Sequence, residues 1–300
     1  MTSFLSTLAR PLLGSLALAG CAPLDLLDAV VATTAEERRL GVAYGPGPRQ
    51  RLDLYLPAPG ARPPAVVVFV HGGSWSEGRR GQYRFVGQEL ATRGYVAVVP
   101  DYRLHPEGRW PGFVEDVAAA VAWTVRNATD LGGDPGRIVL MGHSAGAYNA
   151  AMVATEPKWL AAHGIDRAAI AGFVGLSGPY DFLPLADPVT RRVFGHVESP
   201  EATQPVRVAA AGAPPTLLVH GGDDDTVLPR NSHRLAERMR SLGVPVTLRL
   251  HAGTGHAGTV LAFSPLSRDD PPVASELARF VADLPAAPGV QSASEGFAAR

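Results

Sequence analysis

Ser144 is the residue whose type and surroundings most strongly suggest chemistry. It lies in the pentapeptide GHSAG, residues 142–146, directly after the apolar run RIVLM. The pattern Gly-x-Ser-x-Gly is typical of a tight turn from a strand to a helix, where a Cβ at either glycine would collide with a neighbouring element. The N-terminus of the following helix favours negative charge near the serine. The pattern indicates a serine nucleophile, and close packing of small residues is the alternative interpretation.

A serine hydroxyl is a weak nucleophile and needs a general base. In chains with this turn, the acid and then the histidine follow the serine. The segment HAGTGHAG, after the last apolar run, holds His251 and His256. His256 is predicted as the base because its glycine-rich loop can reach over the sheet, whereas His251 ends the strand itself. A metal site at these two histidines is disfavoured because no other ligands cluster with them.

The acid that would orient the imidazole is not defined by residue type alone. The segment HGGDDDTVLP follows the strand PTLLV and offers Asp223, Asp224 and Asp225, and Asp181 in GPYDF is a further candidate. The segment HGGSW follows the apolar run AVVVFV. Its adjacent glycines allow backbone N–H groups to point into the site and, with the N–H of Ala145, to bind the oxyanion of a tetrahedral intermediate.

The other histidines receive structural interpretations. His71, the first residue of HGGSW, is predicted to hold its loop rather than to act as a base. His143 occupies the variable position of GHSAG and is assigned no chemical role. His105, His163 and His196 are interpreted as surface residues or as satisfied core residues.

Strands and helices alternate along the chain, which predicts a mainly parallel sheet with helices on both faces. Residues 52–56 alternate apolar and polar side chains, which predicts a half-buried strand, whereas 65–70 reads as a strand buried on both faces. Residues 179–213 interrupt the alternation and are predicted to form a small cap. Further strands are expected at 95–100, 137–141, 169–178, 215–221 and 245–251, and helices near 79–92, 113–128, 229–242 and 273–283. The candidate residues all follow strands, where open parallel sheets bind ligands.

Length and composition favour one globular α/β domain. The chain has 300 residues, of which 46% are hydrophobic, and its formal net charge is −1. No basic block stands out, so nucleic acid is not expected as a partner. The catalytic domain is predicted to span residues 49–285, and residues 286–300 to form a frayed tail. A monomer is expected by default.

The N-terminal residues predict export. The apolar run PLLGSLALAG is too short to span a bilayer and fits the core of a signal peptide over residues 1–20. The segment LAGC resembles a bacterial lipobox, in which Cys21 is lipidated, and residues 21–48 would form a tether. Cys21 is the single cysteine of the chain, so it cannot form an internal disulfide. We expect a lipid-anchored protein of the bacterial cell envelope, at the outer membrane or the periplasmic face. An ordinary secretory signal and a periplasmic or secreted protein are the alternative.

Several motifs together resemble those of α/β-hydrolase esterases and lipases and occur in the same order. They are HGGSW, DYRLHP, GHSAG, SGPYD, HGGDDDTVLPRNS and GTGHAG. Over residues 40–285 the chain is similar to the group with an HGG-type oxyanion motif, which includes hormone-sensitive-lipase-like, feruloyl-esterase-like and kynurenine-formamidase-like enzymes. The resemblance implies an α/β-hydrolase fold and a Ser-His-Asp triad, and it is much less specific for the substrate.

The resemblance also implies roles for individual residues. Ser144 would be the nucleophile and His256 the general base. The family pattern H-G-x-x-D-x-x-V-x-P, counted from the histidine of HGGDDDTVLP, implies Asp224 as the acid, with Asp225 as the alternative if the count starts from the valine. Many relatives carry a third glycine where this chain has a serine in HGGSW, a change that keeps the backbone donor. The N–H groups implied for the oxyanion hole are those of Gly73, Ser74 and Ala145.

These features together predict a serine carboxylesterase that hydrolyses short-chain acyl esters through an acyl-enzyme, without a metal or a cofactor. One alternative is an amide hydrolase, either an arylformamidase or a peptidase, that uses the same triad. Another is a surface binding protein that keeps the hydrolase fold without turnover. The expected ligand of the leading hypothesis is a small-molecule ester.

Overall fold

The computed structural model describes residues 35–267 and 269–285. The predicted signal peptide, Cys21 and the predicted frayed tail lie outside these residues. The strands are β1 Glu37–Ala43, β2 Arg51–Leu56, β3 Val66–Val70, β4 Val96–Pro100, β5 Ile138–His143, β6 Ile170–Leu176, β7 Thr216–Gly221 and β8 Val246–His251. The helices are η1 Arg80–Tyr83, α2 Arg84–Thr92, α3 Gly112–Asn127, α4 Ala145–Thr155, α5 Lys158–Ala161, η2 Arg167–Ala169, α6 Pro188–Phe194, η3 Pro200–Thr203, α7 Pro205–Val208, α8 Arg230–Ser241, α9 Gly258–Leu261 and α10 Val273–Asp283.

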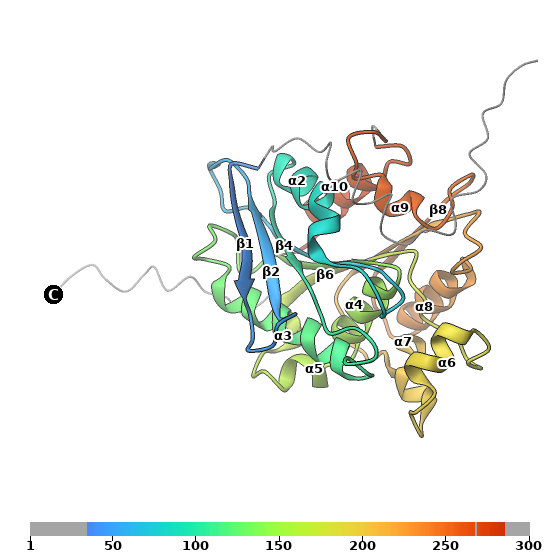
Figure 1. Ribbon diagram of the computed structural model, residues 1–300. Helices are drawn as coiled ribbons and strands as arrows, with labels where there is room; N and C mark the ends of the chain where they lie inside the picture. The colour runs from blue at the N-terminus through green and yellow to red at the C-terminus, as the bar shows by residue number, and fades with distance from the viewer. Residues whose placement is uncertain (1–34, 268, 286–300) are drawn as a thin grey trace, which may run out of the picture.

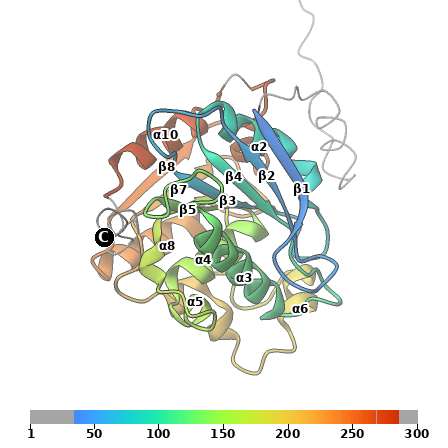
Figure 2. The ribbon, with the colours of Figure 1, turned by 90° about the vertical axis from the view of Figure 1, so that its left-hand side faces the viewer.

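The strands form one eight-stranded sheet in the order β1-β2-β4-β3-β5-β6-β7-β8. Strands β3 to β8 run parallel, and β1 and β2 add an antiparallel edge. Helices α3, α4 and α8 cover one face, and α2 and α10 cover the other (Figure 1; Figure 2). The α/β prediction is therefore confirmed, including the mainly parallel sheet with helices on both faces.

The core consists of two apolar layers, one on each face of the sheet. Phe113, Tyr148 and Leu235 lie in the layer under α3, α4 and α8. Phe85 and Leu277 lie in the opposite layer, under α2 and α10. Alternate residues of the β-branched strand β3 enter the two layers, so both faces of this strand are buried, as its continuous apolar run predicts.

Strand β2 is buried on both faces, so the prediction of a half-buried strand at 52–56 is wrong. Asp53 and Tyr55, the residues expected on the solvent face, are 5% and 1% exposed. Asp53 accepts hydrogen bonds from the N–H of Gly41 and from Arg80 Nε, both at 2.7 Å. The alternation of residue types is misleading here because partners from distant segments satisfy the polar side chain.

Strand β1 lies inside the segment predicted as a tether. Residues 37–43 pair antiparallel with β2, so the tether prediction is wrong for these residues. The strand carries mostly exposed side chains, because it is an edge strand that buries little apolar surface. Its sequence ERRLGVA therefore shows neither the alternation nor the apolar run that predicts a strand.

Residues 179–213 contain α6, η3 and α7, which lie together at one side of the α4 and α8 layer (Figure 1). Phe194 of α6 packs edge-on against Trp75, with ring centroids 4.9 Å apart, and also contacts Tyr148 of α4. This segment thus covers the end of the sheet where β3 and β5 finish. Among the described residues, no helix combines the length and apolar character needed to cross a bilayer.

Helix α2 approaches the sheet closely at Gly87, and a substitution at this position tests that contact. A Cβ at Gly87 would lie 2.3 Å from the buried ring of Tyr55, whereas a Cβ at Gly81 would lie 4.0 Å from Arg79 Nε. We expect Gly87→Ala to lower the free energy of unfolding by roughly 1–3 kcal/mol through overpacking. Gly81→Ala should change it by less than about 0.5 kcal/mol. Urea denaturation measures both, and equal stabilities would contradict this packing.

Candidate active site

Ser144 stands at the sharp turn between β5 and α4. Its φ of +54° is unusual for a residue other than glycine, and its N–H donates to Leu176 O at 2.9 Å. A Cβ at Gly146 would lie 2.1 Å from Val70 O, and one at Gly142 would lie 2.4 Å from Gly146 O. The two flanking glycines are therefore required by close backbone contacts, and the turn presents the serine side chain at the end of the strand.

The structure brings Ser144, His256 and Asp224 together in one chain of hydrogen bonds. Ser144 Oγ lies 2.8 Å from His256 Nε2, and His256 Nδ1 lies 2.8 Å from Asp224 Oδ2. His256 is in the loop after β8, and Asp224 is in the loop after β7. The serine hydroxyl can thus donate to Nε2 while Nδ1–H donates to the carboxylate, which is the arrangement that activates a serine.

Asp224 is held ionised by several donors. Its Oδ1 accepts from the N–H groups of Thr226 at 3.0 Å and Val227 at 2.8 Å, and its Oδ2 also lies 3.2 Å from His220 Nε2. Burial alone would raise the pKa of this carboxyl group. The hydrogen bonds from His220 and His256 outweigh burial and hold the pKa of Asp224 well below its usual range.

The other acidic candidates have different surroundings. Asp225 and Asp223 are exposed, and Asp223 Oδ1 accepts a long hydrogen bond of 3.3 Å from a backbone N–H in the His256 loop. Asp181 forms an ion pair of 2.7 Å with Arg234 of α8. Only Asp224 among the four candidates is within hydrogen-bond distance of His256.

His251, the histidine not chosen as the base, is engaged elsewhere. Its Nε2 lies 3.1 Å from Glu276 Oε2 on α10. Within residues 35–267 and 269–285, no group of three or more histidine, cysteine or acidic side chains is placed to hold a metal ion.

The HGGSW loop follows β3 and borders the nucleophile. Gly73 has φ +120°, and both Ser74 and Trp75 adopt left-handed conformations with φ +51° and +57°. Ser74 and Ala145 line the same cavity as Ser144. Within the described residues, neither the Ser74 nor the Ala145 N–H donates to a protein acceptor. Both donors are therefore available to a bound oxyanion.

Gly73 has a conformational role in this loop and is not among the residues that line the cavity. A Cβ at this position would lie 2.1 Å from Glu77 O, so only glycine fits the turn. Its predicted role as an oxyanion donor stays a prediction.

Contacts beneath the loop agree with the interpretation of His71 as a loop-holding residue. His71 is fully buried, and its Nδ1 lies 2.7 Å from Gly72 O. Its ring stacks on Tyr102 with centroids 4.5 Å apart, and the Tyr102 hydroxyl donates to His71 O at 2.9 Å. Trp75 Nε1 donates to Asn149 Oδ1 of α4 at 3.2 Å, which ties the far end of the loop to the nucleophile helix.

A cavity of about 590 Å³ opens at Ser144. The residues that line it come from the HGGSW loop, from the turn at Ser144, from residues 179–190, from residues 225–228 after β7 and from the start of α8. Its charged lining residues are Asp181, Asp187, Asp225, Arg230 and Arg234, and its large apolar ones are Trp75, Phe182, Leu183, Val189, Val227 and Leu228. The apolar part suits an acyl or alkyl group beside the serine hydroxyl.

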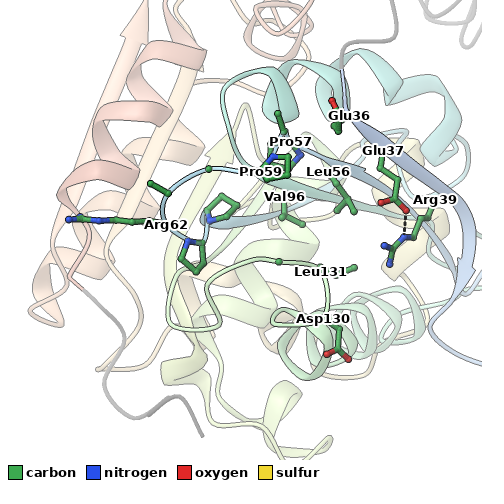
Figure 3. Close-up of a pocket in the computed structure, with 16 residues that line it drawn as sticks. Glu36, Glu37, Arg39, Leu56, Pro57, Pro59, Arg62, Val96, Asp130 and Leu131 are labelled. Atoms are coloured by element: carbon green, nitrogen blue, oxygen red, sulfur yellow. Dashed lines mark hydrogen bonds and ion pairs between the residues drawn. The ribbon is translucent and has the colours of Figure 1, made fainter. Parts of the chain in front are cut away.

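A second cavity, of about 430 Å³, lies far from this site. It is lined by Leu56 at the end of β2, Val96 at the start of β4 and the proline-rich residues 57–64 (Figure 3). These positions are at the amino ends of the parallel strands, opposite the edge that carries Ser144. Two of its charged residues, Glu37 and Arg39, form an ion pair of 2.6 Å with each other.

Sequence reasoning missed three residues that support the site. His220 contacts Asp224, and its Nδ1 lies 2.7 Å from Ser232 Oγ. Asn231 Oδ1 accepts from the N–H groups of Tyr180 and Asp181, which anchors the start of residues 179–213 to α8. His143 contacts the loop of His256. The positions of His220 and His143 within the two motifs were a signal that these side chains lie near the triad.

Comparisons with known proteins agree with this architecture. The BD-FAE family model matches residues 52–239. A probable isoprenylcysteine alpha-carbonyl methylesterase of Arabidopsis thaliana is 33% identical over 245 residues, which are 74% of this chain and 52% of the relative. Esterase LipC of Mycobacterium tuberculosis is 32% identical over 227 residues, 68% of this chain and 55% of the relative. The chain therefore spans about half the length of the curated relatives it matches.

Solved structures of esterases share the fold. Butyrate-bound esterase Est2 of Thermogutta terrifontis matches with a TM-score of 0.67 and 26% identity, over 82% of this chain and 93% of that one. The same esterase phosphonylated by sarin matches with a TM-score of 0.68 and 25% identity, over 84% and 95%. These likenesses confirm the α/β-hydrolase fold that the motifs imply.

The low pKa of Asp224 gives a stability prediction with a definite sign. A carboxyl group whose pKa is lower in the folded than in the unfolded chain stabilises the fold above the unfolded pKa of about 4, and this contribution is lost as pH falls through the folded pKa. We expect Asp224→Asn to lower the free energy of unfolding by roughly 2–3 kcal/mol at pH 7, and the difference from wild type to shrink below about pH 4. Denaturant unfolding across this pH range measures the effect. Asp225→Asn, at the exposed neighbour, is the control and should change the free energy of unfolding at pH 7 by less than about 0.5 kcal/mol.

Proposed function

The chain belongs to the BD-FAE family, and from this premise we propose that it is a serine carboxylesterase. One observation carries the proposal: the Ser144 hydroxyl is hydrogen-bonded to His256, and Asp224 is hydrogen-bonded to the other imidazole nitrogen. The relatives named as esterases and a methylesterase support the same class of reaction.

In the proposed reaction, Ser144 Oγ attacks the ester carbonyl while His256 Nε2 accepts the hydroxyl proton. The ionised Asp224 stabilises the imidazolium that forms and keeps the ring oriented. His256 then donates this proton to the departing alkoxide, leaving an acyl group on Ser144. Water attacks the acyl-enzyme with His256 as the base again, and the acid product and free serine are released.

The oxyanion would be bound by backbone N–H groups. Those of Ser74 and Ala145 border the serine and have no acceptor among the described residues. Donors already in place cost no reorganisation when charge develops on the carbonyl oxygen. The replacement of a third glycine by Ser74 therefore leaves the donor intact.

We propose short acyl chains as the preferred substrates. The lining of the cavity combines apolar side chains with charged ones, among them the Asp181–Arg234 ion pair. A long acyl chain that fills this cavity would remove water from some of these charged groups, which is unfavourable without a compensating contact. A related esterase, that of Thermogutta terrifontis, has been solved with butyrate and with propionate bound.

Hydrolysis of p-nitrophenyl esters from acetyl to palmitoyl tests the proposal. We expect turnover to be fastest with the short acyl groups and to fall by at least about 10⁴-fold in Ser144→Ala. Undiminished hydrolysis by Ser144→Ala would contradict the proposal. A chain that cleaves a formyl anilide but no ester would be an amide hydrolase, and one inactive on both would be a binding protein.

We further propose that the chain is a lipoprotein of the bacterial cell envelope, exported by residues 1–20 and anchored through a lipid on Cys21. The support is the sequence LAGC after a short apolar run. A lipid anchor with more than one acyl chain holds a protein stably at a membrane.

Expression of the full chain in a bacterial host tests this anchor. We expect the protein in the membrane fraction, with intact-mass analysis showing a lipid on Cys21, and Cys21→Ala in the soluble fraction. An unlipidated mature protein that partitions as Cys21→Ala does would contradict the anchor and favour the secreted or periplasmic alternative.

A further inference from the structure

His143 is a buried histidine beside the triad with no assigned chemistry. It is the last residue of β5 and is 5% exposed. Its Nε2 lies 3.1 Å from the carbonyl oxygen of His256, and the two imidazole centroids are 5.0 Å apart. A carbonyl oxygen only accepts, so Nε2 carries the hydrogen and His143 donates to the backbone of the catalytic histidine.

The loop that receives this hydrogen bond is rich in glycine. Its sequence is AGTGHA, residues 252–257, and Gly253 has φ +73°. Glycine leaves a backbone with many accessible conformations, so the loop needs contacts from the rest of the fold to place the imidazole. The hydroxyl of Thr259 also reaches His256 O, but at 3.4 Å. The shorter contact comes from His143, on the same strand-to-helix turn as Ser144.

The His143 ring lies between the two loops that border the nucleophile. Its Nδ1 would lie 3.2 Å from a Cβ placed on Gly72, so the ring packs closely against the HGGSW loop. Within the described residues, Nδ1 has no hydrogen-bond partner. The ring is therefore oriented by close packing on one side and by the His256 carbonyl on the other.

His143 is also uncharged at neutral pH. Burial and then the proximity of His256 lower the pKa of His143 to about 3. The titratable groups that face it are His256, Asp224 and His220. A neutral ring adds no positive charge beside the imidazolium that forms on His256 during the reaction, so its contact favours the geometry without opposing the charge.

We propose that His143 is a positioning residue, which fixes the His256 loop through its Nε2–H and thereby sets the alignment of the imidazole with Ser144. The inference rests on the proposed function, in which His256 is the general base. His143 touches neither the substrate nor Ser144 Oγ in this account. Its effect on the rate would come through the position of His256.

Two replacements of similar length separate the hydrogen bond from packing. His143→Gln keeps an N–H donor near the position of Nε2, and His143→Met removes the donor while filling similar space. With a short-chain p-nitrophenyl ester, we expect His143→Gln to retain kcat within about threefold. His143→Met should lower kcat by about 10- to 100-fold, because small misplacements of a catalytic group have effects of this size. KM should change by less than about twofold in both.

Equal kcat values for the two variants would overturn the inference, even where both are less stable than wild type. Thermal unfolding of both variants shows whether either has lost its fold. Loss of fold would lower the concentration of active enzyme and leave the kcat of each remaining active site unchanged. Titration of the active serine with a fluorophosphonate gives that concentration. A wild-type chain without ester hydrolysis would instead remove the proposed function, and this inference with it.

Nitrogen-15 NMR of the wild-type histidines gives a second test that needs no variant. We expect one imidazole to remain neutral with hydrogen on Nε2 from about pH 5 to pH 9, where ordinary histidines titrate. If this resonance is absent from the spectrum of His143→Gln, it belongs to His143. A neutral His143 that carries its hydrogen on Nδ1, and so has no Nε2–H to donate, would overturn the inference.

Discussion

The hydrogen bond between Ser144 and His256 joins atoms on residues 112 positions apart in the chain. It depends on the parallel arrangement of β5, β6, β7 and β8, whose carboxyl ends finish at one edge of the sheet. At these carboxyl ends, the backbones of the strands and of the following loops pack closely against one another. A Cβ at Gly221, at the end of β7, would lie 2.3 Å from Thr254 O in the loop of His256. The glycines at strand ends thus allow the loops of Asp224 and His256 to meet over Ser144.

The charge states of Asp224 and His143 follow from this close packing, which excludes water from both side chains. A buried carboxylate is costly unless donors replace the water it loses. Asp224 receives two backbone N–H groups and lies against two imidazoles, so it remains ionised next to His256. His143, buried beside His256, is kept neutral by the same lack of water. The proposed base therefore contacts one charged partner, which stabilises an imidazolium, and one uncharged partner, which does not oppose it.

Ser144 and His256 could be predicted because their signals are local. Ser144 sits in a turn whose glycines are required by sterics, and His256 lies in a glycine-rich loop after the last apolar strand. Asp224 could be separated from Asp223 and Asp225 only through the family resemblance, because all three follow the same strand. Features that depend on distant contacts could not be predicted. The burial of Asp53 depends on Arg80, and β1 is recognisable as a strand only from its pairing with β2. The contact of His143 with His256 likewise joins two loops whose approach is visible only in the folded chain.

The central claim is that Ser144 is an activated nucleophile, and its rate of reaction with a fluorophosphonate tests this most directly. Such a reagent forms a stable bond with a serine oxygen only when a base removes the proton and the oxyanion is stabilised. Intact-mass and peptide analysis should show one adduct, on Ser144, which forms rapidly in wild type and much more slowly in His256→Ala. Absence of an adduct in folded wild-type protein, or an adduct on another residue, would contradict the account.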